Sequence, residues 1–563
     1  MKRKGTEIIL EALKRQGVRQ VFGYPGGCVI PLFDEFLNHS DIRLIRVAHE
    51  QAAAHAADGY ARVSGEPGVV IVTSGPGATN TITGIATAHM DSQPMVIITG
   101  QVRSPVIGTN AFQETDVIGV SRPVTKHNYL VKDLDQLPRI LQEAFYLAKS
   151  GRPGPVLIDL PVDLQTMTTE ADFEEKITIP GYQEVQPAAP ELVRQAWEMI
   201  RHAARPMIYA GGGVILGRAG QELVKFATAT GIPVGTTLLG QGAISEGHEL
   251  ALGMLGMHGT YAANWAINRA DLVIALGARF DDRVTGKVES FLAQARIIHV
   301  DIDPAVIDKI KKADLGIVAE VKDFLSHLNQ LAQPVQMNGW RDEIKQVQRS
   351  HPLPNYDAAP MKDGELRPEF IIKEFSRQTQ GNALIVSDVG QHQMFTALHY
   401  EFTRPGGHVT SGGLGTMGFA LPAAMGACFA PGHPQVISFS GDGGFQMNIQ
   451  ELATVRSYNL PIVIVVFNNR NLGMVKQWQD LFWDGRYAST LTPLGPDFVT
   501  IAKGYDLPGR RISKKEEVAP AIAEALAHQG PILLEFELDP HALVYPMIPA
   551  GREFKDIMEG DPQ

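Results

Sequence analysis

The stretch that decides the fold reads VISFSGDGGFQMNIQELATVRSYNLPIVIVVFNN, from Val436 to Asn469. A short β-like run leads into a glycine-rich turn, and a helix-like run leads into a second apolar run that closes with two asparagines. Glycines at such a turn let the backbone approach a ligand closely. The helix expected from Gln446 to about Tyr458 would direct its first N–H groups at a phosphate. The stretch therefore predicts two strands and a ligand-binding turn of an α/β fold.

Two side chains in this stretch carry oxygen atoms at the ends of the two strands. Asp442 offers a carboxylate, and Asn469, 27 positions later, offers an amide. Hard oxygens of this kind suit a Mg²⁺ ion that bridges to a diphosphate. A Gly-Asp-Gly alone can also mark an ordinary strand-to-turn junction, and the paired asparagines make the pattern specific. The pattern resembles the metal-diphosphate motif of enzymes that use thiamine diphosphate (ThDP).

Length and charge indicate a multidomain globular protein. The 563 residues are too many for one core, so three domains are expected. The net charge of −11 argues against non-specific binding to nucleic acid, and no basic tract with interleaved aromatic residues occurs. No apolar run nears the roughly 20 residues that a membrane span needs. We therefore expect neither a nucleic acid nor a membrane as partner.

Cysteine usage and the N-terminal sequence bear on location. Cys28 and Cys428 are isolated from one another, which excludes a disulfide framework and a Cys-based zinc site. This usage fits a reducing compartment. The basic first residues lead into an amphipathic helix pattern rather than the apolar core of a signal peptide. We expect a cytoplasmic protein.

Helical patterns alternate with β-rich runs along the chain, which predicts an α/β fold of three doubly wound parallel-sheet domains. Strands expected in residues 1–165 are Gln20–Tyr24, Leu44–Val47, Gly68–Thr73, Met95–Thr99 and Val156–Leu160. Those expected in residues 190–335 are a run from Arg205, then Ile232–Thr237, Leu272–Leu276 and Arg296–Asp301. Those expected in residues 366–540 are Leu384–Ser387, Val436–Ser440, Ile462–Phe467 and Ile532–Glu537, and residues 541–563 form a tail. The first and third blocks look alike, so a diverged duplication is plausible.

The middle block carries a nucleotide signal of its own. Asp301 closes a strand, where an acid can hydrogen-bond ribose hydroxyls, and the turn Gly211–Gly213 could approach a dinucleotide. A capped strand and a tight turn explain the same residues equally well.

Glu50 opens a helix that is rich in alanine. An acid at a helix start is most often a cap or a partner of the helix dipole. The small residues Ala52–Ala57 allow tight packing, which would leave Glu50 in a dry position where a carboxyl group keeps its proton. Glycine-rich turns at Gly23–Gly27, Ser74–Gly77 and Ser411–Met417 suggest a cleft around a cofactor.

These segments resemble the large, catalytic subunit of acetohydroxyacid synthase (acetolactate synthase) over about residues 5–555. The segments that carry the resemblance are Gly23–Gly27, His49–Gln51, Thr73–Asn80, Ala111–Thr115, Lys126–His127, Arg279–Gly286, Asp388–His392, Ser411–Met417, Gly441–Gly443, Asn468–Asn469 and Gly473–Trp478. Several occur across ThDP enzymes, whereas Arg279–Gly286 and Gly473–Trp478 are much more specific. The resemblance implies a pyrimidine-binding first domain, a Rossmann-like FAD-binding middle domain and a diphosphate- and Mg²⁺-binding third domain.

The resemblance implies three cofactors: ThDP, Mg²⁺ and FAD. It places Glu50 against N1′ of the ThDP aminopyrimidine and Met417 beneath the bent cofactor as a bulky support. The other implied ThDP contacts are Pro76, Asn80, Gln391, His392, Gly415, Gly441, Asp442, Gly443, Gly444, Asn469 and Asn471. Asp442, Asn469 and the carbonyl of Asn471 are the implied Mg²⁺ ligands. The implied FAD contacts are Arg152, Gly211, Gly212, Gly213, His258, Gly259, Arg279, Asp301, Asp303 and Glu320.

Two features of the resemblance concern assembly and the adenine side. Glu50 and Asp442 lie in different domains yet would reach opposite ends of one cofactor, so a homodimer or dimer of dimers is implied. The family usually has Gly-Asp where this chain has Ala319-Glu320, which keeps the carboxylate. A small regulatory subunit is a further partner that the family often has.

On the substrate side, the resemblance places Arg283 at the mouth of the site, where it could bind a 2-keto acid carboxylate bidentately. A surface ion pair with Asp281 or Asp282 is the alternative reading of Arg283. Trp478 resembles the residue that shapes the acceptor pocket and favours 2-oxobutanoate. The remaining residues implied in this region are Gly27, Gln113 and Lys126 as catalytic groups, and Phe112 and Met474 as substrate contacts.

The expected activity is that of acetohydroxyacid synthase. Such an enzyme decarboxylates pyruvate and condenses the two-carbon unit with a second pyruvate or with 2-oxobutanoate, in branched-chain amino-acid synthesis. Alternatives are a pyruvate oxidase, a catabolic acetolactate synthase, which lacks the Arg279–Gly286 flavin block, and glyoxylate carboligase, which lacks the glutamate. A non-catalytic protein that retains the fold is a further alternative, and intact Glu50, Asp442 and Asn469 oppose it.

Overall fold

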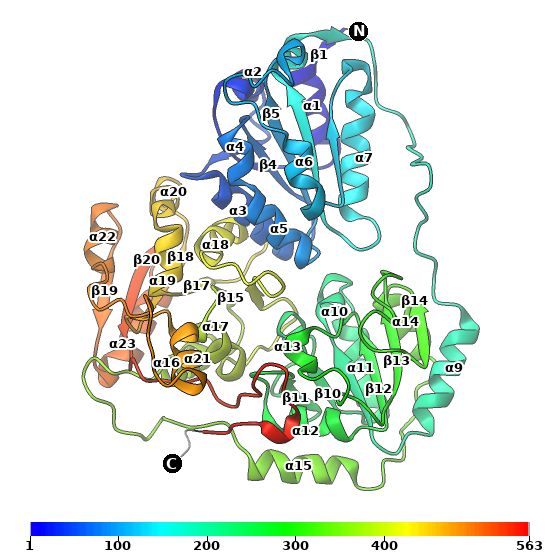
Figure 1. The fold of residues 1–563 in the computed structure, drawn as a ribbon, viewed down its shortest axis with the longest axis vertical. Coiled ribbons are helices and arrows are strands. Elements are labelled where there is room, and N and C mark those ends of the chain that lie inside the picture. Colours follow the sequence, from blue (N-terminus) through cyan, green and yellow to red (C-terminus); the bar gives the residue numbers. More distant parts are fainter. Residues whose placement is uncertain (1, 561–563) are drawn as a thin grey trace.

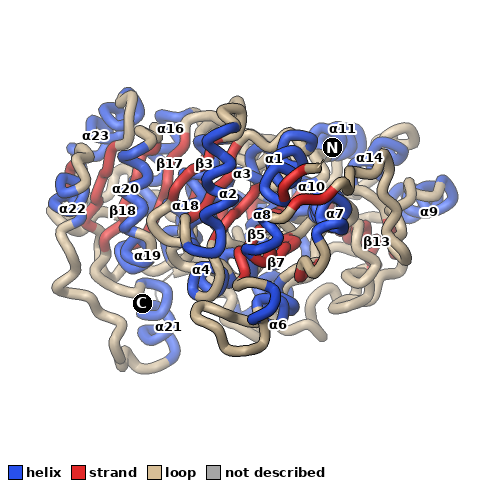
Figure 2. The backbone as a smooth tube through the Cα atoms, turned by 90° about the horizontal axis from the view of Figure 1, so that it is seen from above, coloured by secondary structure: helices blue, strands red, loops and turns tan. Residues whose placement is uncertain are grey.

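Three six-stranded sheets, each wholly parallel, organise the chain into three α/β domains (Figure 1). The computed structural model describes residues 2–560. Residue 1 of the predicted first domain and residues 561–563 of the predicted tail lie outside the described residues. Apolar runs such as β4 (Gly68–Val72), β12 (Leu272–Leu276) and β18 (Ile462–Asn468) are buried on both faces because helices cover both sides of each sheet (Figure 2). The predicted class, three doubly wound α/β domains, is confirmed.

The N-terminal domain holds a sheet of order β3-β2-β4-β5-β7-β6. Its strands are β2 (Gln20–Tyr24), β3 (Arg43–Arg46), β4 (Gly68–Val72), β5 (Met95–Gln101), β6 (His127–Leu130) and β7 (Pro155–Pro161). Its helices are α1 (Gly5–Arg15), α2 (Ile30–Glu35), α3 (Glu50–Ser64), α4 (Pro76–Asn80), α5 (Ile82–Met90), α6 (Val117–Ser121), α7 (Leu137–Lys149) and α8 (Val162–Thr166). The short strands β1 (Arg3–Lys4) and β8 (Thr168–Thr169) pair antiparallel beside it.

The middle domain holds a sheet of order β11-β10-β9-β12-β13-β14. Its strands are β9 (Pro206–Ala210), β10 (Val234–Thr236), β11 (Ala251–Met254), β12 (Leu272–Leu276), β13 (Arg296–Asp301) and β14 (Leu315–Val318). Its helices are α9 (Pro190–Arg201), α10 (Gly212–Leu216), α11 (Gly220–Thr230), α12 (Tyr261–Arg269), α13 (Asp282–Thr285), α14 (Val321–Leu328) and α15 (Trp340–Ser350). Numbered within the domain, the strands follow the 3-2-1-4-5-6 order of dinucleotide-binding folds, as the Rossmann-like prediction requires.

The C-terminal domain holds a sheet of order β16-β15-β17-β18-β20-β19. Its strands are β15 (Leu384–Ser387), β16 (His408–Thr410), β17 (Val436–Gly441), β18 (Ile462–Asn468), β19 (Gly509–Ile512) and β20 (Ile532–Glu537). Its helices are α16 (Pro368–Thr379), α17 (Gln391–His399), α18 (Ala420–Phe429), α19 (Asp442–Met447), α20 (Leu452–Ser457), α21 (Gly473–Phe482), α22 (Phe498–Gly504) and α23 (Lys515–Ala527). Numbered within each domain, this sheet and the N-terminal sheet share the order 2-1-3-4-6-5, as a diverged duplication would produce.

One predicted helix has different bounds in the structure. The helix after the glycine-rich turn begins at Asp442 rather than Gln446, and it is interrupted before α20. Asn448 adopts non-helical dihedrals (φ −133°, ψ 26°), and its side-chain amide donates to the carbonyl of Gly418 over 2.7 Å. This bond ties the interruption between α19 and α20 to the loop before α18.

Helices α3 and α18 join the N- and C-terminal domains through direct backbone contact. A Cβ on Gly59 of α3 would lie 2.1 Å from the carbonyl oxygen of Ala423, and one on Gly426 of α18 would lie 1.8 Å from that of Ala56. No larger side chain fits at either glycine, and one apolar core extends through both domains. The buried carboxylate of Glu451 adds a polar tie, because it accepts the backbone N–H groups of Ala48 and His49.

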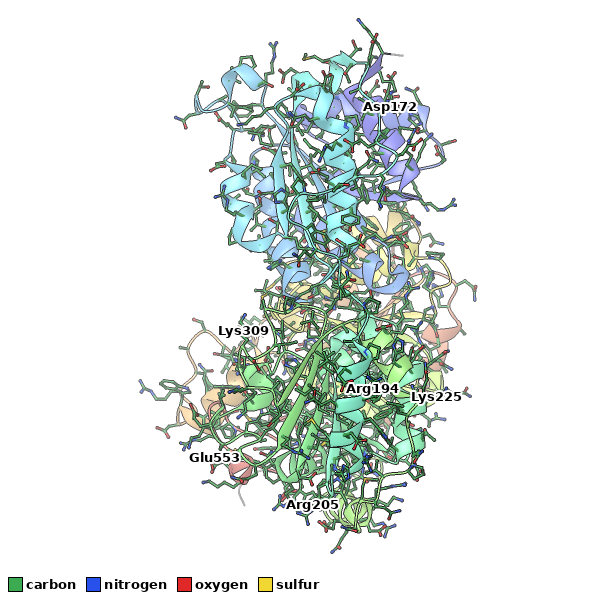
Figure 3. All side chains as sticks on the ribbon, turned by 90° about the vertical axis from the view of Figure 1, so that its right-hand side faces the viewer. Asp172, Arg194, Arg205, Lys225, Lys309 and Glu553 are labelled. Carbon is green, nitrogen blue, oxygen red and sulfur yellow. The ribbon has the colours of Figure 1, made fainter. Side chains whose placement is uncertain are left out.

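The linker and the tail run along the outside of the domains. Residues 170–189 descend from the N-terminal domain to α9, largely without regular structure (Figure 1). The tail after β20 crosses to the middle domain, and Figure 3 labels Glu553 of this tail. Glu553 pairs there with Lys287 at 2.8 Å. Across residues 2–560, no helix combines the length and apolar character required to traverse a bilayer.

Candidate active site where the three domains meet

A cavity of about 1050 Å³ lies between the middle and C-terminal domains and reaches the edge of the N-terminal domain. It collects most of the residues that the sequence assigned to cofactors. Those predicted for ThDP that line it are Gln391, His392, Gly415, Met417, Gly441, Asp442, Gly443, Gly444, Asn469 and Asn471. Those predicted for FAD that line it are Arg152, Gly212, Gly213, His258, Arg279, Asp301 and Glu320. The residues predicted for the two cofactors therefore share one cavity.

The predicted metal ligands lie together at the carboxyl ends of β17 and β18. Asp442 is buried, and the hydroxyl of Thr492 donates to its Oδ2 over 3.3 Å. Asn469 Oδ1 accepts the backbone N–H of Asn471 over 3.1 Å, and Asn469 Nδ2 donates to Gln391 Oε1 over 3.3 Å. These contacts orient a carboxylate and an amide toward the same cavity wall.

The chemistry of this corner fits a hard divalent cation. Burial raises the pKa of Asp442 to about 6, because the ionised carboxylate lacks a nearby positive charge. A cation would supply that charge, and carboxylate, amide and carbonyl oxygens are suitable Mg²⁺ ligands. Within residues 2–560 no cluster of three His, Cys, Asp or Glu side chains could hold a metal alone.

His392 and two glycines shape the neighbouring wall. Burial lowers the pKa of His392 to about 3, which keeps the imidazole neutral, and its buried Nε2 has no hydrogen-bond partner among the described residues. A Cβ on Gly441 would lie 3.0 Å from His392 Nδ1, and one on Gly443 would lie 2.8 Å from the Leu472 side chain. The unpaired Nε2 on a wall of this cavity fits the approach of a polar ligand such as a diphosphate.

The loop between β16 and α18 carries the predicted pyrimidine contacts. Gly415 has a positive φ of 71°, and the methyl carbon of Met417 comes within 3.5 Å of the position that a Cβ on Gly443 would occupy. The base of the loop is fixed from its own domain, because Asp388 accepts the backbone N–H of Gly418 over 2.9 Å. Met417 therefore stands next to the glycine-rich turn, as a support for a bent cofactor must.

The middle-domain wall offers unpaired polar atoms to a ligand. Tyr209 Oη and His258 Nε2 are both buried without a hydrogen-bond partner in the part of the chain that the structure describes, and both residues line the cavity. Burial lowers the pKa of His258 to about 4 and raises that of Asp301 to about 6. Orphaned donors and acceptors in a Rossmann-like fold fit a large polar cofactor such as a flavin dinucleotide.

Three residues predicted for FAD lie outside the cavity lining, as far as residues 2–560 define it: Gly211, Gly259 and Asp303. A Cβ on Gly211 would lie 2.1 Å from the Gly277 carbonyl oxygen, so this glycine serves the packing of two loops. Asp303 instead pairs with Arg152 across 3.4 Å. Their predicted contact with FAD stays a prediction.

On the substrate side, Arg283, Met474 and Trp478 line the cavity, whereas Phe112 does not within the described chain. The Arg283 side chain is 60% exposed, and its Nε lies 3.8 Å from Asp282 Oδ2. This distance describes a loose pair that a carboxylate ligand could replace, since exposed ion pairs contribute about 0–1 kcal/mol. The ion pair and the predicted role are therefore compatible.

The remaining N-terminal residues of the prediction form a separate group. Gly27, Glu50, Pro76, Asn80, Gln113 and Lys126 do not line the cavity, as judged over residues 2–560. Glu50 stays half-buried and accepts a hydrogen bond from Asn80, so one chain does not complete the predicted dry position. The Lys126 ammonium donates to the carbonyls of Leu147 and Ser150, and burial lowers its pKa to about 8.

Comparisons with known proteins agree with this arrangement. Residues 3–120, 193–328 and 388–536 match the families described as the N-terminal TPP binding domain, the central domain and the C-terminal TPP binding domain of thiamine pyrophosphate enzymes. The chain is 47% identical to acetolactate synthase 1, chloroplastic, of Zea mays, across 99% of this chain and 89% of that protein. It is 44% identical to the probable acetolactate synthase large subunit of Methanococcus aeolicus, across 99% and 95% respectively. The chain belongs to the acetolactate synthase family.

Membership of the acetolactate synthase family confirms the predicted family and the predicted class of ThDP-dependent enzyme. Acetolactate synthase 1, chloroplastic, of Nicotiana tabacum is a further relative, at 44% identity across 99% of this chain and 85% of that protein. ThDP is therefore the cofactor that the domain composition supports.

The structure adds residues to which the sequence alone assigned no role. Thr492 reaches Asp442 from 50 positions away, and Asp91 accepts two backbone N–H groups from the loop that carries Met417. Neither residue belongs to a motif of the acetolactate synthase resemblance, and no local pattern signals either contact.

Proposed function

We propose that this protein is the catalytic subunit of an acetohydroxyacid synthase. Two pyruvate ions and a proton would give one 2-acetolactate ion and CO₂. Pyruvate with 2-oxobutanoate would give 2-aceto-2-hydroxybutanoate in the same way. The observation that carries the proposal is the shared cavity, which is lined by Asp442 and Asn469, by loops of the middle domain and by Trp478. It occurs in a chain that is related to acetolactate synthases over nearly its full length.

The C-terminal domain would hold ThDP through its diphosphate. Asp442, Asn469 and the Asn471 carbonyl would bind Mg²⁺, while Gln391 and His392 would contact the diphosphate. When bound, ThDP would supply a carbon nucleophilic enough to add to the ketone of a 2-keto acid, and its ring would take up the electron pair that decarboxylation releases. The protein's own contribution is geometry and electrostatics, and the buried Asp442 carboxylate and neutral His392 suit that role.

Glu50 would hold or move the proton at the far end of the cofactor. Its side chain lies away from the cavity of its own chain, so the proposal requires Glu50 from a second copy. Large apolar side chains that are exposed in the single chain support such a contact: Tyr24, Ile30 and Phe112 on the N-terminal domain, and Leu414, Met447 and Trp483 on the C-terminal domain. A homodimer, or a dimer of dimers, is therefore part of the proposal.

Arg283, Trp478 and Met474 would receive the substrates. The exposed and loosely paired guanidinium of Arg283 suits a carboxylate of pyruvate or 2-oxobutanoate. Trp478 packs edge-on against Phe482 at 5.7 Å between ring centroids, which presents an apolar wall to the side chain of the acceptor. A wall of this kind would favour the longer 2-oxobutanoate.

The middle domain would bind FAD along the strand ends that line the cavity. The fold order, the buried Asp301 and the unpaired His258 and Tyr209 atoms support a dinucleotide there. A cytoplasmic location and a small regulatory subunit remain parts of the proposal. The relative from Methanococcus aeolicus is named a large subunit, which supports a small subunit for that protein.

The test is incubation of the purified protein with ThDP, Mg²⁺, FAD, pyruvate and 2-oxobutanoate, followed by product analysis. We expect CO₂ release with acetolactate and acetohydroxybutyrate, and no need for an electron acceptor. Product formation that requires an acceptor would indicate a pyruvate oxidase. Binding of ThDP without CO₂ release would contradict the proposed activity.

A further inference from the structure

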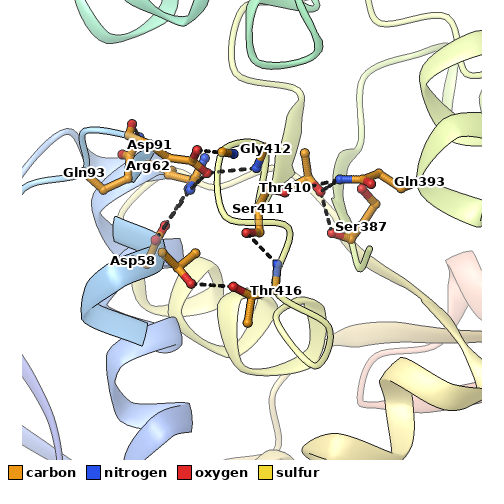
Figure 4. Close-up of polar contacts among 12 residues, drawn as sticks. Asp58, Arg62, Asp91, Gln93, Ser387, Gln393, Thr410, Ser411, Gly412 and Thr416 are labelled. Carbon is orange, nitrogen blue, oxygen red and sulfur yellow. Dashed lines mark hydrogen bonds and ion pairs between the residues drawn. The ribbon is translucent and has the colours of Figure 1, made fainter. Parts of the chain in front are cut away.

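Asp91 joins the N-terminal domain to the loop that is predicted to hold the ThDP pyrimidine. It directly follows α5, and its two carboxylate oxygens accept the backbone N–H groups of Gly412 (3.0 Å) and Gly413 (2.7 Å), as Figure 4 shows. Gly412 and Gly413 belong to the C-terminal domain and lie more than 300 positions after Asp91 in the sequence. A charged acceptor on two successive N–H groups fixes the direction of the loop backbone.

Arg62 at the end of α3 holds Asp91 in place. The guanidinium bridges Asp58 and Asp91, with Nη2 2.8 Å from Asp91 Oδ2 (Figure 4). The side chains of both aspartates are fully buried, and that of Arg62 is 8% exposed. Arg62 also lies over the ring of Phe419, 5.4 Å from its centroid, immediately beyond the loop. The triad therefore has little freedom to move.

The base of the loop is rigid, whereas its tip is open. Thr416 is 9% exposed, and its hydroxyl lies 2.7 Å from that of Thr87 on α5. Ser411, 1% exposed, accepts the backbone N–H of Thr416. Leu414 at the tip is 44% exposed, and the neighbouring Gly415 and Met417 line the cavity. Ties from α5 thus set the position of a ligand-facing tip.

Ser92, the next residue, faces a different cofactor region. Its hydroxyl accepts from Arg152 Nε over 2.7 Å, and Arg152 pairs with Asp303 of the middle domain. Its side chain makes no contact with the 411–417 loop among the described hydrogen bonds. Asp91 therefore reaches the C-terminal domain directly, whereas Ser92 is linked to the middle domain only through Arg152.

We propose that Asp91, held by Arg62, is a positioning residue for ThDP: it fixes the 411–417 loop so that Gly415 and Met417 meet the pyrimidine in one geometry. The proposal rests on the proposed function, because it needs ThDP to bind at that loop. A purely structural role for Asp91 would make it one more tie between domains that α3 and α18 already join.

The experiment compares Asp91→Asn with Ser92→Ala as its matched neighbour. Apo protein in Mg²⁺ is titrated with ThDP, and separately with FAD, by isothermal calorimetry, and kcat and KM are measured for pyruvate. Asp91→Asn keeps the size of the side chain but removes the charge that two N–H groups and Arg62 share. We expect ThDP affinity about 10- to 100-fold weaker, with FAD affinity and KM for pyruvate near wild type. Ser92→Ala is expected to weaken FAD and leave ThDP unchanged.

Circular dichroism and the thermal midpoint of the apo protein establish folding. Where Asp91→Asn does not fold, Gly413→Ala takes its place, because the added Cβ would lie 2.8 Å from Asp91 Oδ1 and displace the loop while keeping the triad charged. Wild-type ThDP affinity in folded Asp91→Asn, or in folded Gly413→Ala where it takes the place of Asp91→Asn, would overturn the inference. Equal losses of ThDP affinity and FAD affinity in both Asp91→Asn and Ser92→Ala would overturn it as well. Failure of the wild-type protein itself to bind ThDP would overturn the proposed function, and the inference with it.

Discussion

The side-chain amide of Asn80 donates a hydrogen bond to Oε2 of Glu50 over 3.0 Å. Asn80 closes α4 and Glu50 opens α3, so the bond sets the direction of the carboxyl group from a second helix. The N-terminal domain thus orients Glu50 before any partner contributes. The two residues make separate contributions that substitution can distinguish.

Replacing Glu50 by Gln is expected to remove proton transfer while keeping shape. Turnover should fall by roughly 10²- to 10⁴-fold, the usual contribution of general acid–base catalysis. ThDP affinity, measured by calorimetry, and the thermal midpoint should stay near wild type because the amide still fits. Near-normal turnover in a folded Glu50→Gln protein would refute the assigned role.

Replacing Asn80 by Ala removes the bond that orients Glu50. We expect kcat to fall about tenfold, the equivalent of one hydrogen bond to a charged group, with KM for pyruvate little changed. Thr79→Ala serves as the control, because the one hydrogen bond of the exposed Thr79 hydroxyl within residues 2–560 goes to the Pro76 carbonyl on the same helix. Equal effects of the two substitutions on kcat would show that α4 acts only as a packing element.

Replacing Thr492 by Val tests the contact with Asp442. Loss of the hydroxyl leaves the buried carboxylate with fewer donors when no cation is bound, at a cost of about 1 kcal/mol. The cation compensates for this loss, so the rise in thermal midpoint on adding Mg²⁺ with ThDP should be larger in Thr492→Val than in wild type. Thr490→Val is the matched control, since its hydroxyl bonds to the Ala488 carbonyl within the same loop. An equal rise in all three proteins would contradict the prediction.

Asp159 in β7 gives the N-terminal domain a defined pH dependence. Burial raises its pKa from 3.8 to about 7, against hydrogen bonds from Thr99 and Gln101. The folded state therefore keeps a proton that the unfolded chain loses near pH 4, and the free energy of unfolding decreases as pH rises from about 4 to 7. Between pH 5 and pH 7 this amounts to roughly 2 to 3 kcal/mol.

The measurement is the denaturation midpoint of wild type and Asp159→Asn from pH 5 to pH 8. Other groups titrate in both proteins, so the difference between the two curves isolates Asp159. We expect the variant to lose less stability over this window and the two curves to become parallel only near pH 8, because the Asp159 carboxyl group is still half protonated at pH 7 in the folded protein. Parallel curves over the whole range would show that Asp159 is ionised in the folded protein.

The central strands could be predicted from the sequence, whereas most edge strands could not. Strands such as β2, β12, β13, β15 and β20 have the predicted bounds, because apolar runs buried on both faces leave an unmistakable pattern. In the three six-stranded sheets, the strands that the prediction missed are β6, β11, β14, β16 and β19, and all five lie at sheet edges. β19 reads Gly-Arg-Arg-Ile with one buried residue, so its pairing depends on β20 rather than on its own composition.

The residues of the candidate site also divide into those that the local sequence predicts and those that it does not. Residues in glycine-rich turns at strand ends, such as Asp442 and Gly443, could be found because the turn itself demands those residue types. The contact between Asp91 and Gly412 could not be predicted, because a hydrogen bond between residues 321 positions apart produces no pattern in the local sequence. Gly211 shows a related limit: its predicted contact with FAD stays a prediction, and the structure adds a packing requirement, because a Cβ there would lie 2.1 Å from the Gly277 carbonyl oxygen.

The central claim is that each site takes Glu50 from one copy of the chain and Asp442 from another. The most direct test mixes two inactive variants, Glu50→Gln and Asp442→Asn, after co-expression or subunit exchange. In a mixed dimer, one site carries both substitutions and the other carries neither. With random pairing, half of the dimers are mixed and have one of two sites intact, so roughly a quarter of wild-type activity should return. Activity that stays at the level of the separate variants, with mixed dimers demonstrated by mass, would contradict the account.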